Sequence, residues 1–494
     1  MKKGSCVKIL FFLALILLLD GSTAFLGAEF DLDRYTRIND HWRITGYWRV
    51  RLESLNFFNP KSRVDFRDSF AYPALLGRLG LKMDYPWIEG LVEGQVTGMW
   101  NLPGAADAYG PGAVYFAHHR DHNLGVVFLH QGYLRLKPPC LPGLGLQAGR
   151  FEYFLEDEFK TGDKAMDFLR SVRIGQRLVG PFGFSHVWRS FDGVQAAYDD
   201  KRVNLTFTAT RPTQGGFELQ GMDELSHIDL LTGALTVKAG VLAPHTEIAL
   251  IHVTYRDDRG VRPTDNRTLA GVTPAPLNQE PLQIHTLGGH LLGVYPAGPG
   301  ALDALGWWAV QWGHWGTLRH RAFAYAVEGG YQFRQLAWKP WLRLGWFQGS
   351  GDSDPRDNTH ETFFQILPTA RLYAFFPFYN LMNNRDLFFQ VLLYPYAQGF
   401  IRVDYHALWL DEANDLWYFG AGATRRDLIF GYSGRNPGGH RSLAQVAEIT
   451  FKHNLSKYLW TEFYYGHAFG GKAVDRLFGN HQADFFFVEL NLKF

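Results

Sequence analysis

Apolar and polar residues alternate with a period of two along much of the chain. From residue 42 to residue 53, one face of an extended segment is apolar and the other polar: Trp42, Ile44, Gly46, Trp48, Val50 and Leu52 against Arg43, Thr45, Tyr47, Arg49, Arg51 and Glu53. The same division recurs over residues 203–210 and 401–407. This pattern predicts β-strands with one face against an apolar medium and the other against water.

The last residues of the chain strengthen that interpretation. Phe486, Val488, Leu490 and Leu492 alternate with polar or small positions, and the sequence ends on Phe494. A soluble sandwich would also have an apolar face, but a final strand of this kind is typical of bacterial outer-membrane barrels. We therefore expect the last strand to lie in the wall of a membrane barrel.

The order of short and long connections indicates how the strands are arranged. Eighteen strands are predicted, near 42–53, 74–84, 90–99, 128–137, 144–151, 192–198, 202–210, 232–239, 246–256, 283–294, 306–314, 320–334, 340–349, 386–394, 398–410, 442–453, 457–468 and 483–494. Even-numbered strands are followed by short connections, except for a longer piece after Tyr295, and odd-numbered strands mostly by long ones. The predicted fold is all-β: a single transmembrane antiparallel β-barrel with long extracellular loops and short periplasmic turns. A count of 16 strands stays open, and the pattern does not place the apolar runs within 350–385 and 411–441.

The N-terminal residues differ from the rest of the chain. Lys2, Lys3 and Lys8 precede an apolar run from residue 9 to residue 19, and small residues follow at positions suited to cleavage, near Ala24 or Ala28. The run is too short to span a bilayer. We expect a secretory signal peptide over 1–24 and the outer-membrane barrel over 29–494.

Composition excludes two other classes of protein. With 46% hydrophobic and 16% aromatic residues, the chain can bury enough surface to fold, which a disordered chain cannot. After the first 20 residues no apolar run is long enough for a membrane helix, and the mean hydropathy is only −0.17. The 40 Phe, 23 Tyr and 15 Trp suit a surface at a lipid–water interface, where Trp307, Trp308, Trp312 and Trp315 would form an aromatic belt; stacking on sugar rings is the alternative.

Charge and cysteine content narrow the list of partners. Removal of the predicted signal leaves 46 basic and 47 acidic residues, so the overall charge gives no reason to expect nucleic-acid binding. Only Cys140 would remain in the mature chain, which leaves no disulfide within it. Among the basic residues, however, Arg outnumbers Lys by 34 to 15.

Arginine is the side chain best shaped to bind a carboxylate, through two parallel hydrogen bonds. If the polar faces line the lumen, a row of cations would form a conduit for an anionic substrate: Arg43, Arg49, Arg51, Arg78, Lys82, Arg135, Lys137, Lys238, Arg343 and Arg402. The alternative is that these cations pair with lumen acids, for which Glu53, Asp84, Glu93, Glu328, Asp404, Glu448 and Glu489 are available.

The most specific string lies between residues 149 and 194. It contains Gln176-Arg177-Leu178, then Trp188-Arg189, then Phe191-Asp192-Gly193. Here the chain resembles the alginate export family of outer-membrane proteins, and the loop sequence from Gly345 to Asp352 agrees with that resemblance. The resemblance implies a monomeric eighteen-stranded barrel whose Arg- and Lys-lined lumen passes an acidic polysaccharide outward, with loops as gates. It carries over Gln176, Arg177, Trp188, Arg189, Asp192 and Gly193 as motif residues that line the pore or order a loop.

Two clusters could hold a metal ion. His118, His119, Asp121 and His122 offer ligands for Zn²⁺ or Cu²⁺, but neighbouring residues rarely converge on one ion. Asp352, Asp354 and Asp357 have a spacing that a structural Ca²⁺ in an outer loop could use, although the Gly and Glu of an EF-hand loop are missing and a solvated loop is favoured. We expect no metal and no cofactor.

The sequence therefore predicts a passive channel of the bacterial outer membrane that exports an anionic, alginate-like polysaccharide, in contact with membrane lipid and periplasmic export proteins. A general or anion-selective porin for small solutes is the alternative, and an adhesin or receptor using the outer loops is a third reading. A hydrolase at the barrel rim is more distant, because Ser185 and His186 are the only tempting pair and their direct adjacency disfavours a productive geometry. We expect no catalytic residues.

Overall fold

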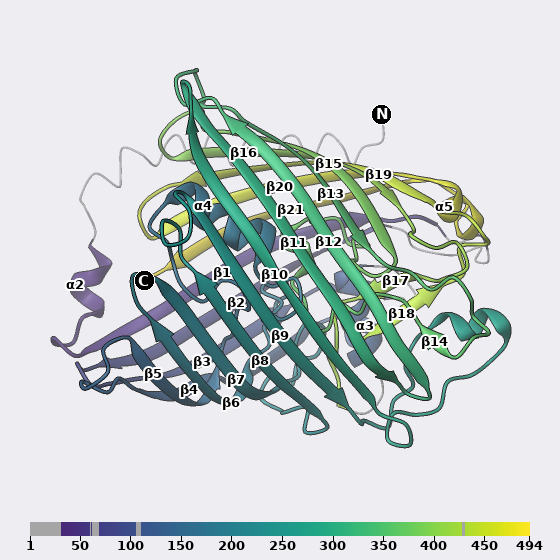
Figure 1. Ribbon diagram of the computed structural model, residues 1–494, viewed down its shortest axis with the longest axis horizontal. Helices are drawn as coiled ribbons and strands as arrows, with labels where there is room; N and C mark the ends of the chain where they lie inside the picture. Colours follow the sequence, from purple (N-terminus) through teal and green to yellow (C-terminus); the bar gives the residue numbers. More distant parts are fainter. Residues whose placement is uncertain (1–30, 60, 62–68, 105–109, 427–429) are drawn as a thin grey trace.

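The computed structural model describes residues 31–59, 61, 69–104, 110–426 and 430–494. Eighteen of its strands form one closed antiparallel barrel, because each pairs with its neighbours in the wall and β1 pairs with β21 (Figure 1). The predicted fold class and the count of eighteen are confirmed. The predicted signal peptide over 1–24 lies outside the described residues.

The strands of the wall follow the predicted positions closely. They are β1 (Trp42–Asn56), β2 (Ser69–Asp84), β3 (Ile88–Met99), β4 (Leu124–Leu136), β5 (Leu144–Phe151), β6 (Phe191–Asp199), β7 (Val203–Pro212), β8 (Ile228–Val237), β9 (Thr246–Asp257), β10 (Leu282–Ala297), β11 (Gly300–Trp315), β12 (Leu318–Gln332), β13 (Trp341–Gly349), β15 (Asn384–Leu393), β16 (Gly399–Trp409), β19 (Ser442–Asn454), β20 (Leu459–Gly470) and β21 (Gln482–Lys493).

Shorter elements lie in the connections. The strands are β14 (Thr359–His360), which pairs with β12, and β17 (Trp417–Gly420) with β18 (Tyr432–Arg435), which form a separate hairpin. The helical segments are α2 (Leu32–Thr36), α3 (Pro111–His119), α4 (Lys164–Leu169), η1 (Arg170–Ile174), η2 (Asn266–Ala270), η3 (Ala370–Leu372) and α5 (Lys472–Leu477). None of the described helices has the length and apolar character needed to cross a membrane.

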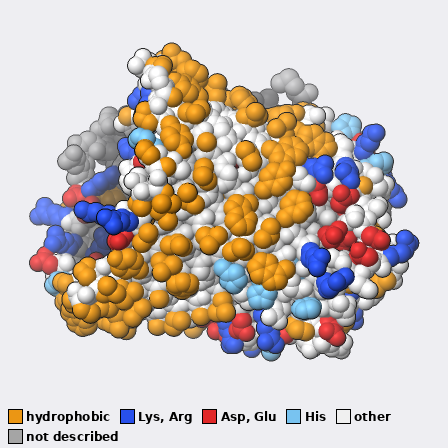
Figure 2. All heavy atoms as spheres, viewed as in Figure 1, with side chains coloured by type: hydrophobic (Ala, Val, Ile, Leu, Met, Phe, Trp, Pro, Cys, Tyr) orange, Lys and Arg blue, Asp and Glu red, His pale blue; other side chains and the backbone are white. Residues whose placement is uncertain are grey.

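Alternation along the strands separates the two faces of the wall. On β1, Arg49 and Arg51 are each 3% exposed and face the lumen, whereas Val50 between them is 53% exposed and faces outward. Outward apolar side chains of many strands cover the visible face as a broad hydrophobic belt (Figure 2). A buried polar face and an exposed apolar face are the reverse of a soluble protein and match a lipid-facing barrel wall.

One connection is shorter than predicted. Strands β10 and β11 continue until Ala297 pairs with Gly300, so the longer piece expected after Tyr295 is a tight turn. The turn is feasible because Gly298 adopts a φ of 52°, in the left-handed region that glycine enters without strain. The periplasmic end of the barrel therefore carries a short turn here as well.

Two long connections fold into the barrel, and the second of them falls in 350–385, one of the two stretches that the sequence pattern could not place. Inner loop 1 (residues 152–190) connects β5 to β6, and inner loop 2 (residues 350–383) connects β13 to β15. The two loops join edge to edge, since the N–H of Leu367 donates to the carbonyl of Leu178 over 2.8 Å and the N–H of Thr369 to that of Gln176 over 2.9 Å. Leu178 and Leu367 are both fully buried.

A third segment lies against this pair of loops. The cap segment (residues 410–426 and 430–441) connects β16 to β19 and contains the β17–β18 hairpin. The hydroxyl of Tyr432 donates to the carbonyl of Ile366 in inner loop 2 over 2.9 Å. Arg189 of inner loop 1 donates to the carbonyl of Ala423 over 3.1 Å. Three long connections thus meet and fill part of the lumen.

Candidate functional site

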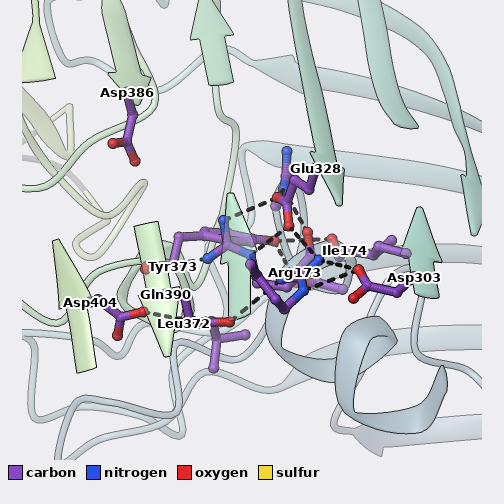
Figure 3. Close-up of polar contacts among 12 residues, drawn as sticks. Arg173, Ile174, Asp303, Glu328, Leu372, Tyr373, Asp386, Gln390 and Asp404 are labelled. Atoms are coloured by element: carbon purple, nitrogen blue, oxygen red, sulfur yellow. Dashed lines mark hydrogen bonds and ion pairs between the residues drawn. The ribbon is translucent and has the colours of Figure 1, made fainter. Parts of the chain in front are cut away.

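The contact between inner loop 1 and the barrel wall is a cluster of ion pairs around Glu328 (Figure 3). Glu328 on β12 accepts from Arg173 at 2.9 and 3.0 Å and from Arg177 at 3.2 Å. Arg343 on β13 reaches Glu328 at 3.2 Å and Asp303 on β11 at 3.0 Å. All five side chains are nearly inaccessible. We call this cluster the Glu328 latch.

Local structure in inner loop 1 aims its arginines at the wall. Asp163 caps α4 by accepting hydrogen bonds from the backbone N–H groups of Ala165 and Met166. The helix continues into the wider turn η1, which carries Arg170 and Arg173. Arg170 donates to Glu247 on β9 over 2.5 Å. The loop is therefore attached by ion pairs to β9 as well as to β12.

The opposite end of inner loop 1 is attached to β1. The Arg49 guanidinium donates to the carbonyls of Gly183 at 3.0 Å and Ser185 at 2.5 Å, and Arg51 donates to the carbonyl of Phe184 at 2.8 Å. Inner loop 1 thus crosses the lumen between distant parts of the wall.

Most of the cations predicted to line the lumen are paired with acids. The pairs are Arg51–Glu489 (2.6 Å), Arg78–Glu152 (2.7 Å), Lys82–Glu89 (3.4 Å), Lys137–Asp84 (2.5 Å), Lys238–Asp199 (2.8 Å), Arg343–Asp303 (3.0 Å) and Arg402–Asp404. Arg43 is exposed at the periplasmic end of β1, and Arg135 is half-buried on β4. Seven of the ten predicted lumen cations are therefore paired with acids, which was the alternative to a conduit of free cations.

Three buried arginines are held by main-chain carbonyls instead. Besides Arg49, they are Arg189, which donates to the carbonyls of Gly180 and Ala423, and Arg371, which donates to those of Phe375 at 2.7 Å and Pro377 at 2.9 Å. Within the part of the chain that the structure describes, none of the three forms an ion pair with a carboxylate. Burial lowers the pKa of both Arg189 and Arg371 to about 10, so each stays charged at neutral pH.

Arg371 lies at a cavity of about 260 Å³ between the inner loops and the outer connections. Phe182, Phe217, Tyr379 and Phe419 supply most of its aromatic lining. A buried cation beside flat apolar rings can bind a carboxylate and the ring that carries it. The sequence reasoning missed Arg371 because it lies in the stretch 350–385, where no strand pattern gave its side chain a face.

The family-motif residues have distinct structural places. Gln176 has a φ of 63° and joins inner loop 1 to inner loop 2 through its carbonyl. Trp188 packs under Arg78, whose guanidinium carbon lies 4.2 Å from the ring centroid. Arg177 belongs to the Glu328 latch, and Arg189 fastens inner loop 1 to the cap segment.

Asp192 and Gly193 lie in the wall. Asp192 on β6 receives two hydrogen bonds of 2.6 Å from Arg150 on β5. In the next pair Gly193 faces Gly149, and a Cβ on Gly193 would lie 2.1 Å from the carbonyl oxygen of Ala209. These motif positions tie together the two strands that flank inner loop 1.

The residues of the two clusters considered for metal binding each contact a different partner and do not converge on one point. His118 hydrogen bonds to the carbonyl of Phe217 and His122 to the carbonyl of Leu102, while His119 Nε2 lies 3.3 Å from a carboxylate oxygen of Glu218. Asp352, Asp354 and Asp357 accept hydrogen bonds from the backbone of their own loop. Among the described residues, no group of three or more His, Cys, Asp or Glu side chains is arranged to hold a metal ion.

Ser185 and His186 have different partners, and the four Trp residues lie on two different faces of the wall. The Ser185 hydroxyl donates to the carbonyls of Phe182 and Val187, while His186 contacts Glu53 at 2.9 Å. Trp307 and Trp315 are buried and donate to Glu156 and Asp265, whereas Trp308 and Trp312 are exposed on the outer face. Only the second pair lies where an aromatic belt requires.

A family model, Alginate export, matches residues 170–488 of the chain. No curated protein matches the sequence. Solved structures with the same architecture include Pseudomonas aeruginosa OccK11 (OpdR), at 11% identity and a TM-score of 0.52, covering 92% of this chain and 95% of that one. Acinetobacter baumannii OccAB2 is similar at 7% identity and a TM-score of 0.56, covering 91% and 98%.

A third similar structure is Pseudomonas aeruginosa OpdK with vanillate, at 10% identity and a TM-score of 0.52, covering 91% of this chain and 98% of that one. At such identities the likeness concerns the fold.

Proposed function

The chain belongs to the alginate export family of bacterial outer-membrane channels, and on that premise we propose that it passes an anionic polysaccharide outward through its lumen. The observation that carries the proposal is the set of three buried arginines, Arg49, Arg189 and Arg371, whose guanidinium groups are held by carbonyls rather than by acids.

Carbonyl oxygens orient a guanidinium group without neutralising it. A buried charge without a counter-charge is unfavourable, so an anion that reaches it gains more than it would at an existing ion pair. The paired cations of the wall are already compensated, and among the buried cations Arg49, Arg189 and Arg371 are the contacts that favour a negatively charged substrate. Several such contacts of moderate strength would allow each sugar to bind and then move on.

Movement of inner loops 1 and 2 is part of the proposal. Both loops fill part of the lumen and share a hydrophobic core with the wall, and they are also linked to it by ion pairs and hydrogen bonds. Those polar links are the contacts that a polyanion can replace one at a time. The Glu328 latch joins the largest number of charged groups, because one carboxylate holds three guanidinium groups. Release of the latch would free the part of inner loop 1 around Arg173 and Arg177 from β12.

Planar-bilayer recordings of the purified channel test this function. We expect anion-selective currents that sodium polymannuronate blocks, and we expect Arg371→Gln to raise the blocking concentration about tenfold. The matched control is the double variant Arg78→Gln/Glu152→Gln, which removes a neutral ion pair and should be blocked like the parent. Cation selectivity, or equal block of the parent and Arg371→Gln, would overturn the proposal.

A porin for small carboxylated solutes is the second candidate. The cavity beside Arg371 is about 260 Å³, which suits a single ring and its carboxylate better than a length of polymer. OpdK, a structural neighbour, was determined with vanillate, a solute of that size. Liposome-swelling rates separate the two functions: uptake of glucuronate without any block by polymannuronate favours the porin.

A further inference from the structure

A group of basic side chains lies on the outer, lipid-facing surface at the extracellular end of β10, β11 and β12. His314, Arg319 and Arg321 are exposed there, and His285 is half-buried. The strand register brings them together, since His314 is opposite Arg319 and Trp312 lies between His285 and Arg321. We call these four residues the basic rim patch. Figure 2 shows His (pale blue) and Lys or Arg (blue) side chains at the border between the hydrophobic belt and the charged end.

The patch differs from the neighbouring parts of the rim. On β5 to β8 the outward charges are matched across strands: Arg150 with Asp192 at 2.6 Å, and Arg211 with Asp229 at 2.8 Å. Neither Arg319 nor Arg321 forms an ion pair with a carboxylate of the described residues. The patch therefore carries positive charge that no described carboxylate pairs with, unlike the matched charges of β5 to β8.

Aromatic residues mark the depth of the patch in the membrane. Trp312, directly opposite Arg321, is 44% exposed and stacks on His285 with ring centroids 5.8 Å apart. Phe323 and Val310 follow on the membrane side, each 42% exposed. Tryptophan prefers the level of the lipid head groups, so the cations sit at head-group level rather than among the loops.

We propose that the basic rim patch binds the phosphate groups of a phosphorylated glycolipid of the outer leaflet. Two guanidinium groups and two imidazoles face lipid head groups without acids between them, and Arg pairs with phosphate through two parallel hydrogen bonds. The acyl chains of the same lipid would lie along Trp312, Phe323 and Val310. This site is on the outside of the wall and is independent of the lumen.

Native mass spectrometry of the folded channel in detergent tests the proposal, with diphosphoryl lipid A as the probe. We expect Arg319→Gln/Arg321→Gln to weaken lipid A binding tenfold or more, because each cation near a charged lipid surface adds several-fold to affinity. The matched control, Arg211→Gln/Asp229→Asn, alters a neutral pair at the same rim and should bind within twofold of the parent.

Two further arms keep the result decisive. Arg319→Lys/Arg321→Lys retains the charge but not the paired hydrogen bonds and should lose less affinity than the glutamine variant, which separates loss of charge from loss of fold. Dephosphorylated lipid A should bind the parent no better than it binds the glutamine variant. Unchanged binding by Arg319→Gln/Arg321→Gln overturns the proposal, as does equal affinity of the parent for phosphatidylglycerol and lipid A.

Discussion

Glu328 and Arg173 lie 155 positions apart in the chain, yet Arg173 donates two hydrogen bonds, of 2.9 and 3.0 Å, to this one carboxylate. Glu328 belongs to the wall and Arg173 to inner loop 1. The pair therefore fixes a loop inside the lumen to a strand that is hydrogen-bonded to a neighbour on each side. Its loss is the most direct way to release the loop.

We expect Glu328→Gln to open the channel. The substitution leaves Arg173, Arg177 and Arg343 with one fewer negative partner, and breaking a buried pair in this way costs about 3–5 kcal/mol. Single-channel recordings should show larger and more frequent openings than in the parent. Glu89→Gln, which breaks the pair with Lys82 at the periplasmic end, should leave the openings unchanged. Parent-like traces for Glu328→Gln would mean that the latch does not hold the loop.

A second prediction separates Arg49 from its neighbour Arg51. Arg49→Gln removes a charge that no acid compensates, so the ratio of anion to cation permeability should fall several-fold. Arg51→Gln/Glu489→Gln removes an ion pair from the same strand and should leave the ratio as it is. Reversal potentials in a KCl gradient measure both. The reverse order of effects would argue against Arg49 as a selectivity residue.

A third prediction concerns pH. Burial and mutual repulsion raise the pKa of Asp352 in inner loop 2 from 3.8 to about 7, and burial raises that of Asp415 in the cap segment to about 6. The backbone N–H of Asp352 donates to the Asp415 carboxyl, which joins inner loop 2 to the cap segment. Because folding favours the protonated form of both carboxyls, this contact between the two segments is strongest near pH 4 and weakens as the pH rises through 6 and 7. Hydrogen exchange over residues 350–362, corrected for the intrinsic rate, should be faster at pH 8 than at pH 5.

Two substitutions check the origin of that pH dependence. Asp352→Asn removes the titrating group and should flatten the difference between pH 5 and pH 8. Asp357→Asn changes an exposed carboxyl of the same loop and should preserve it. If the parent exchanges equally at both pH values, the two carboxyls do not control this contact.

A fourth prediction addresses Gly193 of the family motif. A methyl group there would lie 2.1 Å from the carbonyl oxygen of Ala209, a backbone atom that cannot move without breaking the ladder. Gly193→Ala should therefore lower the yield of folded, heat-modifiable barrel on unheated gels. Gly306→Ala on β11 meets no atom within 4 Å and should fold like the parent. Equal yields would show that the wall tolerates a side chain at Gly193.

The sequence predicts the wall well because lipid and water impose opposite demands on alternate residues. All eighteen strands lie near their predicted positions, and β10 and β11 depart from prediction only in the length of their turn. Inner loop 2 could not be predicted because it is apolar on several sides and packs against another loop rather than against a periodic surface. Arg371 could not be predicted either, because its partners are main-chain carbonyls, which no pattern of side chains indicates.

Asp192 is a residue that the sequence singled out but whose position in the structure it did not indicate. The motif marked it as a residue of the pore or of its loop, and the structure places it in an outward ion pair with Arg150. Alternation places Asp192 on the same outward face as Val194, which is 52% exposed, so the motif alone did not indicate the face on which the pair lies.

The course of inner loop 1 from Arg49 on β1 to Glu328 on β12 makes it a crossbar inside a tube. A tube braced in this way resists flattening, and it loses the brace whenever the bar swings aside. Displacement of the loop would therefore remove this brace as well as clear space in the lumen, and the barrel would deform more easily without it.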